Sequence, residues 1–248
     1  MTLYLLGTGA AVSDPHRTTT MLAVSDGTST LAVDCGGDLV QRMMACGLDP
    51  ATLDGLILTH EHPDHVSGFP LFMEKLWLTG RSRPIPVYGV RAALGQARRL
   101  WEAFDTSRWD GVPEIVWQEV AHEPGTEVLT SDTWHVTAAP VTHPVPTIGL
   151  RIEHGPTSRT VAYSCDTAPC ERVVELGRDA GVLVHEATGA TPGVHSSAEQ
   201  AAEIAAKAGA HRLLLVHLPP GLTDDDLGDA RRWLSEVELG EELGVYNL

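Results

Sequence analysis

Cysteine and long apolar runs are scarce in this chain. Four cysteines occur among 248 residues, and no two of them form a Cys-x-x-Cys pair. This pattern disfavours both a disulfide-rich scaffold and a structural zinc site built from cysteines. No apolar stretch approaches the roughly 18 residues that span a bilayer, and the first residues lack the basic leader of a signal peptide. We therefore expect no membrane partner and a cytoplasmic location.

Positive charge is also in short supply. The chain has 17 lysines and arginines against 33 aspartates and glutamates, so its formal net charge is −16. Because a protein that grips long nucleic acid usually presents a basic face, this balance disfavours tight binding of long RNA, although a local basic patch is compatible with it. The six tryptophans are not interleaved with basic residues along the sequence, so it gives little indication of a base-stacking platform.

No tract rich in Gly, Ser or Pro and no low-complexity segment divides the chain. We therefore expect one domain over residues 1–248, long enough to bury a substantial core. Apolar patterning predicts strands at 2–6, 20–24, 30–34, 55–59, 85–88, 160–165, 181–185 and 212–216. It predicts helices at 68–78, 92–104, 170–178 and 198–207, the last opened by a capping box at Ser197 and Gln200 and ended by Gly209. The tract 114–152 should be mainly antiparallel strands, and an acidic helix should begin at Thr223.

The segment His60-Glu61-His62-Pro63-Asp64-His65 carries most of the functional information. It follows an apolar run at 56–59 that is typical of a short buried strand. Because alternate residues of an extended segment point to the same side, His60 and His62 can reach one metal ion. Pro63 turns the chain, so that Asp64 and His65 face a second position. Imidazoles beside a carboxylate suit zinc or manganese.

Three further polar residues stand at the ends of apolar stretches. His143 follows the stretch that begins at Trp134, Asp166 follows the strand expected at 160–165, and His217 follows the strand expected at 212–216. Open α/β sheets place their sites at the carboxyl ends of their strands. Their shared placement makes these three residues candidates for the same metal site.

The order of these motifs resembles that of the metallo-β-lactamase-fold hydrolases, in particular the RNase Z-like phosphodiesterases. The matching segments are Leu5-Leu6-Gly7-Thr8-Gly9, Val33-Asp34-Cys35-Gly36, His60 to His65, His143, Ser164-Cys165-Asp166-Thr167, His185-Glu186-Ala187-Thr188, His195-Ser196-Ser197-Ala198 and His217. The resemblance implies an α/β fold, the αββα sandwich of the metallo-β-lactamase type, with two mixed sheets packed face to face and helices outside.

The resemblance also implies a dinuclear metal site. One ion would be held by His60, His62 and His143, the other by Asp64, His65 and His217, with Asp166 bridging both. Asp34 would orient a ligand from behind. Two divalent ions are expected, zinc first and manganese as the alternative, and their surplus positive charge would attract an anionic substrate.

Glu186 and His195 complete the set that the resemblance implies. In the RNase Z enzymes the matching histidine donates a proton to the leaving oxygen, and the matching glutamate keeps that histidine protonated. The alternative is a loop histidine with a solvent-facing glutamate. The remaining histidines are expected at surface or half-buried positions: His16, His122, His135, His154, His185 and His211.

Two features depart from the RNase Z pattern. Gly37 stands where related enzymes often have an acidic residue, and the long arm is missing. Those enzymes carry a long Gly/Pro-rich arm that binds tRNA, whereas residues 153–158 have only the length of a hairpin turn. We therefore expect a metal-dependent phosphodiesterase in which a metal-bridging hydroxide attacks phosphorus, with Asp64 and His195 assisting proton transfer. The expected substrate is a small anionic phosphodiester or a short RNA end.

Several alternatives stay open at this point. They are hydrolysis of a lactone, thioester or sulfate ester, and 3′ processing of tRNA. A non-catalytic binding protein is disfavoured because the ligand set is complete. A homodimer is also left open.

Overall fold

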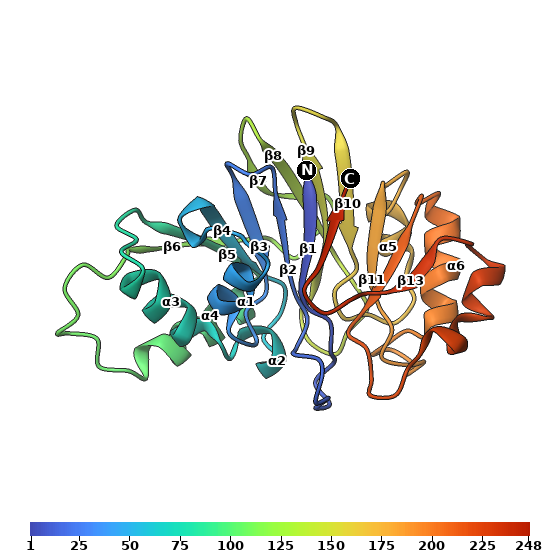
Figure 1. The fold of residues 1–248 in the computed structure, drawn as a ribbon, viewed down its shortest axis with the longest axis horizontal. Helices are drawn as coiled ribbons and strands as arrows, with labels where there is room; N and C mark the ends of the chain where they lie inside the picture. The colour runs from blue at the N-terminus through green and yellow to red at the C-terminus, as the bar shows by residue number, and fades with distance from the viewer.

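Two seven-stranded sheets pack face to face in the computed structural model, which describes all 248 residues (Figure 1). The first sheet has the order β14-β1-β2-β3-β4-β5-β6, and the second has the order β13-β12-β11-β10-β9-β8-β7. The first contains β1 (Thr2–Gly7), β2 (Met21–Ser25), β3 (Thr30–Val33), β4 (Leu53–Leu58), β5 (Ile85–Gly89), β6 (Ile115–Glu119) and β14 (Gly244–Asn247). The second contains β7 (Thr126–Thr130), β8 (Trp134–Pro140), β9 (Ile148–His154), β10 (Arg159–Tyr163), β11 (Val182–Glu186), β12 (Leu213–Val216) and β13 (Val237–Leu239).

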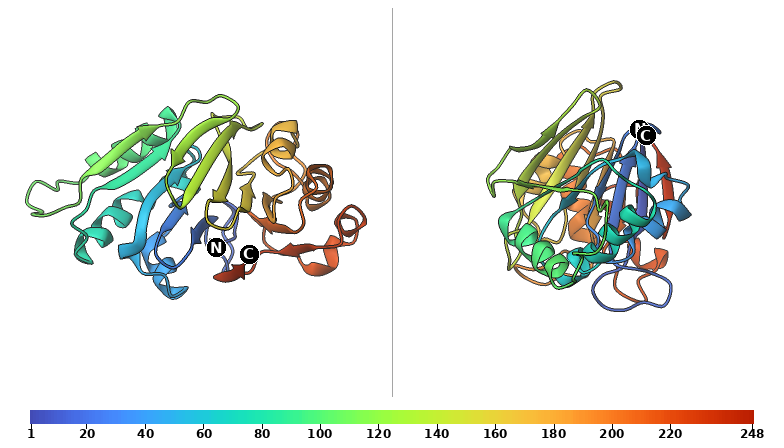
Figure 2. Two further views of the ribbon diagram at one scale, coloured as in Figure 1. Left: turned by 90° about the horizontal axis from the view of Figure 1, so that it is seen from above. Right: turned by 90° about the vertical axis from the view of Figure 1, so that its left-hand side faces the viewer.

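Helices cover the outer faces of both sheets (Figure 2). On the first sheet these are α1 (Leu39–Ala45), α3 (Phe69–Leu78) and α4 (Arg91–Glu102), and on the second they are α5 (Glu171–Leu176) and α6 (Ala198–Ala208). The short α2 (Pro63–Val66) follows β4 directly. The expected αββα sandwich is confirmed. None of the helices combines the length and the apolar character needed to cross a membrane.

The core follows from the alternation of side chains along the strands. In β11, Val182 and Val184 join the large cluster between the sheets, whereas Leu183 joins a smaller cluster beneath α5 and α6. Strands that are buried on both faces have near-continuous apolar sequences, which explains why runs such as 213–216 contain no polar residue. The large cluster includes side chains from Leu3 to Tyr246, and so it draws on both ends of the chain.

The direction of the strands places the candidate site. β3, β4 and β5 are parallel in the first sheet, and β10, β11 and β12 are parallel in the second. The carboxyl ends of parallel strands lie at one edge of a sheet. The segments that carry His60, Asp166, Glu186 and His217 are the carboxyl ends of β4, β10, β11 and β12 or follow them directly.

The tract 114–152 is mainly antiparallel, as predicted, because β7, β8 and β9 pair antiparallel. The exception is β6, which pairs parallel with β5 across α4 in a βαβ unit of the first sheet. The helix expected at Thr223 is a single 3₁₀ turn, Asp224–Leu227. Only Leu227 of that turn is buried, so no apolar stripe supports a longer helix. The elements α1, α2, β13 and β14 were not predicted.

Candidate metal centre

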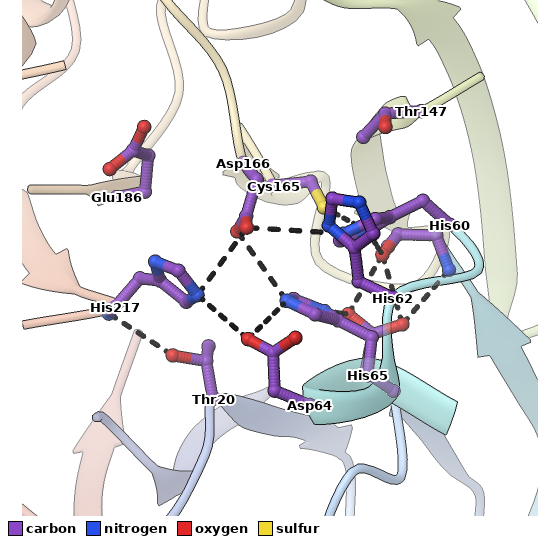
Figure 3. Close-up of polar contacts among 12 residues, drawn as sticks. Thr20, His60, His62, Asp64, His65, Thr147, Cys165, Asp166, Glu186 and His217 are labelled. Atoms are coloured by element: carbon purple, nitrogen blue, oxygen red, sulfur yellow. Dashed lines mark hydrogen bonds and ion pairs between the residues drawn. The ribbon is translucent and has the colours of Figure 1, made fainter. Parts of the chain in front are cut away.

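The seven candidate ligands converge at the edge where the strands end, and Figure 3 labels all of them except His143. The donor atoms of His60, His62, His143 and Asp166 all lie within 4.8 Å of one another. The same is true of a second group: Asp64, His65, Asp166 and His217. These groups correspond to the two ligand sets that the family resemblance implies, and Asp166 belongs to both.

Local structure explains how the histidine-rich segment serves both groups. His60 and His62 follow the buried strand β4, and His62 is still extended at φ −63° and ψ 148°. Pro63 then starts α2, because its ring presets the backbone for the first turn of a helix. Asp64 and His65 therefore project from a helix and not from the strand extension.

Asp166 lies at the middle of the cluster. Its Oδ2 atom is 3.3 Å from His217 Nε2 and 3.9 Å from His60 Nε2, and its Oδ1 atom is 3.5 Å from His65 Nε2. Asp64 Oδ2 approaches His217 Nε2 at 3.2 Å and His65 Nε2 at 3.5 Å. Each of the two carboxylates therefore lies between imidazole nitrogens, an arrangement that suits two bound cations.

Three buried polar atoms in the cluster have no hydrogen-bond partner. They are His60 Nε2, His65 Nε2 and Asp166 Oδ1. An unpaired buried polar atom costs about 1–3 kcal/mol, so three of them in one place need an explanation. Imidazole nitrogens and carboxylate oxygens are ligands of zinc. The donor set therefore fits divalent metal ions.

In four of the five candidate histidine ligands, one ring nitrogen is held by a neighbour, which aims the other nitrogen into the cluster. His62 is the exception, because its Nδ1 atom lies 3.3 Å from His143 Nε2. His65 Nδ1 donates to Asp34 Oδ2 (2.8 Å), His217 Nδ1 to Thr188 Oγ1 (2.6 Å), His143 Nδ1 to the Val194 carbonyl (3.0 Å) and His60 Nδ1 to Thr59 Oγ1 (3.2 Å). Asp34 stands behind His65, as expected.

The pKa values of the cluster residues are shifted in different directions. Burial lowers the pKa of His60 well below its usual value, which keeps the ring neutral and able to bind a cation. Burial also opposes charge on His65, but Asp166 and Asp34 outweigh it and raise the pKa of His65 well above the usual value. For Asp166, burial is outweighed by His217 and His65, and the pKa falls well below the usual value.

Glu186 and His195 form a hydrogen-bonded pair beside the cluster. Glu186 ends β11 and is fully buried, and its Oε1 atom accepts from His195 Nδ1 at 3.0 Å. The carboxylate also accepts from the backbone N–H groups of Ser196 (2.9 Å) and Thr188 (2.8 Å). The alternative of a solvent-facing glutamate is therefore wrong. The hydrogen bond to Glu186 raises the pKa of His195 despite partial burial.

His195 stands between the cluster and solvent. Its ring centroid lies 5.5 Å from that of His143 and 5.6 Å from that of His217, and 19% of its side chain is exposed. A protonated imidazole in this position can meet a group that enters from outside.

Thr188 and Thr59 hydrogen-bond to candidate ligand histidines, a role that was not predicted. Thr188 ends the His-Glu-Ala-Thr segment and Thr59 directly precedes His60, so their positions in these motifs could have indicated it. Cys165 was interpreted as a buried filler, and it is buried, but its Sγ atom also lies 3.5 Å from His60 Nδ1.

Two histidines were wrongly expected at partly exposed positions. His185 and His154 are both buried, because each lies on a strand of the second sheet. The turn between β9 and β10 is residues 155–158, which confirms a hairpin at the position of the long arm.

Comparisons with known proteins agree with this geometry. The family described as "Beta-lactamase superfamily domain" matches residues 30–218. Ribonuclease Z of Mycolicibacterium gilvum is 32% identical, over 96% of this chain and 93% of that protein. Ribonuclease Z of Mycolicibacterium paratuberculosis is also 32% identical, over 96% and 95%.

Solved structures share the fold. The metallo-β-lactamase fold protein YhfI of Bacillus subtilis has a TM-score of 0.82 and 25% identity, covering 99% of this chain and 98% of its own. The short form of human tRNase Z also has a TM-score of 0.82, with 23% identity and coverage of 100% and 99%. The chain belongs to the β-lactamase superfamily and, within it, to the ribonuclease Z-like hydrolases.

Proposed function

We propose that the cluster holds two divalent metal ions and hydrolyses phosphodiesters. Membership of this family implies divalent metal ions, and we propose zinc, with manganese as the alternative. His60, His62 and His143 would hold one ion, Asp64, His65 and His217 the other, and Asp166 both. The observation that carries the proposal is Asp166, whose carboxylate lies in both groups of donor atoms. When bound, two such ions would stabilise charge on the phosphoryl oxygens and acidify the attacking water.

The protein's own side chains supply the proton transfers. Asp64 keeps 12% of its side chain exposed, so its carboxylate can position the attacking water and accept its proton. We propose that His195 donates a proton to the leaving alkoxide. Glu186 holds His195 Nδ1, which leaves Nε2 as the atom that faces the leaving group. A buried carboxylate behind an imidazole favours the protonated ring near neutral pH.

The substrate we propose is a small phosphodiester or a short RNA end. The hairpin at residues 155–158 offers no arm to bind the body of a folded RNA, and the net charge of −16 repels a long polyanion. We propose that residues 1–248 act as one domain in this reaction, because the site and the core draw on both halves of the chain.

A second candidate function is 3′ processing of tRNA. The curated relatives that match over 96% of this chain are named ribonuclease Z, which favours it. Lactone, thioester or sulfate ester hydrolysis would keep the metal site and change only the bond, and the fold by itself does not distinguish these reactions.

The test is a substrate panel on the metal-depleted protein, to which zinc or manganese is returned. We expect turnover of bis(p-nitrophenyl) phosphate only after metal is added, with little turnover of a lactone or a sulfate ester. Faster turnover of the lactone or the sulfate ester would replace the phosphodiesterase proposal. Unchanged turnover after chelation would remove the metal from the reaction.

A further inference from the structure

A groove lies between α4 and the edge strand β6, two elements that Figure 1 shows. It consists of two adjoining hollows of about 380 Å³ and about 360 Å³ that share Arg91 and Glu119. The first hollow reaches Pro146, in the loop that also carries His143. His122 donates from Nε2 to the Thr147 carbonyl at 3.1 Å and so ties this end of the groove to the same loop. One end of the groove is therefore formed in part by the loop that carries His143.

Arg98 lines the second hollow and carries positive charge that no carboxylate neutralises. It is exposed and forms no ion pair, and its guanidinium carbon lies 5.1 Å from the centre of the Trp117 ring. Eight of the fifteen arginines form ion pairs with carboxylates, and Arg98 is one of the seven that do not. Among these seven, Arg98 is the one that lies over an aromatic ring. A guanidinium over a tryptophan ring is attracted to the face of the ring and keeps N–H groups available to an anion.

Arg91 adds a second cation to the same groove. Its partner is Glu119 at 3.0 Å, and the two side chains are 86% and 50% exposed. An exposed ion pair of this kind is weakly held, so a phosphate can take the place of Glu119. Arg91 and Arg98 are two turns apart on α4, which separates them by about 10 Å along the helix axis. They would therefore contact different phosphates of one chain.

Gly95 lies between these arginines, in the middle of α4, and also lines the groove. Glycine in a helix interior is unfavourable compared with alanine. A Cβ atom at this position would meet only Arg99 Nη1, at an ordinary contact distance of 3.5 Å. Packing within the protein therefore does not require glycine here. The missing side chain instead leaves room for a ligand to approach the helix backbone closely.

We propose that this groove binds the single-stranded RNA that flanks the cleaved phosphodiester, with Arg91 and Arg98 on its phosphates. This inference rests on the proposed phosphodiesterase function and names the surface that would hold the rest of the substrate. The sequence did not indicate such a platform, because Arg98 and Trp117 are far apart along the chain. The fold brings them together across α4 and β6.

Fluorescence anisotropy with a labelled single-stranded RNA of about ten nucleotides tests the groove. Binding is measured on the metal-loaded His195→Ala protein, so that cleavage does not interfere, and each groove substitution is added to it. Arg98→Gln should weaken binding by roughly three- to tenfold and should lower the slope of log affinity against log salt by about 0.7. Arg178→Gln is the matched control, because Arg178 is also exposed and forms no ion pair but follows α5 on the second sheet.

Two further substitutions separate a binding role from a structural one. Glu119→Gln should strengthen RNA binding by roughly two- to threefold, because it removes a like charge from the groove. Gly95→Leu should weaken binding while the melting temperature stays equal or rises, since leucine favours the helix more than glycine does. Turnover of bis(p-nitrophenyl) phosphate, measured with His195 intact, should be unchanged in all these variants.

Equal affinities and salt slopes for Arg98→Gln and Arg178→Gln would overturn the proposal, as would an absence of RNA binding by the parent protein. If RNA binding depends on Arg98 but no phosphodiester is hydrolysed, the groove stands and the proposed function fails. If bis(p-nitrophenyl) phosphate is hydrolysed while Gly95→Leu and Arg98→Gln bind RNA normally, the function stands and the groove fails.

Discussion

Asp166 is the side chain on which both groups of donor atoms depend. It is almost fully buried, and it faces His60, His65 and His217 within 4 Å. Burying a carboxylate among imidazoles is unfavourable unless the charges are balanced, so the position of Asp166 makes sense only as part of a charged assembly.

We expect Asp166→Ala to lose metal at both positions, because its carboxylate is the only group common to them. His143→Ala should lose metal at one position and serves as the comparison. Metal content by mass spectrometry, with circular dichroism as a check on folding, measures this. An Asp166→Ala protein that keeps as much metal as the parent would contradict the bridging role.

Glu186→Gln should shift the pH profile of alkyl phosphodiester hydrolysis. The hydrogen bond to Glu186 raises the pKa of His195, so the acid form survives to higher pH in the parent protein. The neutral amide removes this support, the pKa of His195 falls, and activity on the alkaline side should decline at lower pH. An unchanged alkaline limb would show that Glu186 does not control the proton on His195.

His195→Ala is the control for that experiment. Loss of a general acid should slow alkyl diesters by roughly 10²–10⁴-fold and p-nitrophenyl diesters far less, because nitrophenolate leaves without a proton. An equal loss on both substrates would indicate that His195 binds the phosphoryl oxygens instead.

At the scale of elements, the N-terminal cap of α6 lies directly after the loop that carries His195. Ser197 Oγ accepts from Gln200 N–H at 3.2 Å, and Gln200 Oε1 accepts from Ser197 N–H at 3.0 Å. Gly209 ends the helix at φ 69°, in the left-handed region that glycine adopts without strain. The predicted capping box and helix end are both confirmed. Because His195 lies two residues before the cap, the same contacts hold the loop that carries it.

Ser197→Ala should lower the free energy of unfolding by about 1 kcal/mol, since the Gln200 N–H group in the first turn loses its acceptor, Ser197 Oγ. Urea denaturation measures the change. Ser235→Ala is a suitable control, because Ser235 is exposed and lies outside regular secondary structure. Equal midpoints for the two variants would mean that packing, and not capping, holds the start of α6.

At the scale of the whole molecule, the net negative charge and the short hairpin between β9 and β10 both disfavour the binding of a long RNA. The formal net charge of the chain is −16, and α4 carries one of its few groups of neighbouring arginines. A long folded RNA would meet repulsion over most of its length, and no arm compensates for it.

We therefore expect precursor tRNA to bind weakly and with steep salt dependence, whereas small phosphodiesters are cleaved at low and moderate salt alike. Filter binding and cleavage assays over a salt series measure both. Efficient, site-specific 3′ trimming of tRNA at physiological salt would contradict this expectation and support the tRNA-processing candidate.

Local features of the chain were readable from the sequence. The histidine-rich segment, the apolar runs before Asp166 and His217, and the capping box at Ser197 all depend on neighbouring residues. Alternation along a strand and capping at a helix end are short-range effects, so the candidate ligands and most elements could be predicted.

The tertiary structure alone decided the features that join distant segments. Four such features are the parallel pairing of β6, the burial of His154 and His185, the Thr188 contact to His217 and the position of Arg98 over Trp117. All four depend on tertiary packing around the residues and not on the local sequence pattern. The sequence by itself determined which residues can bind metal, because that is a property of side-chain type and local spacing. Only the fold decided which polar atoms stay unpaired, because desolvation depends on everything packed around them.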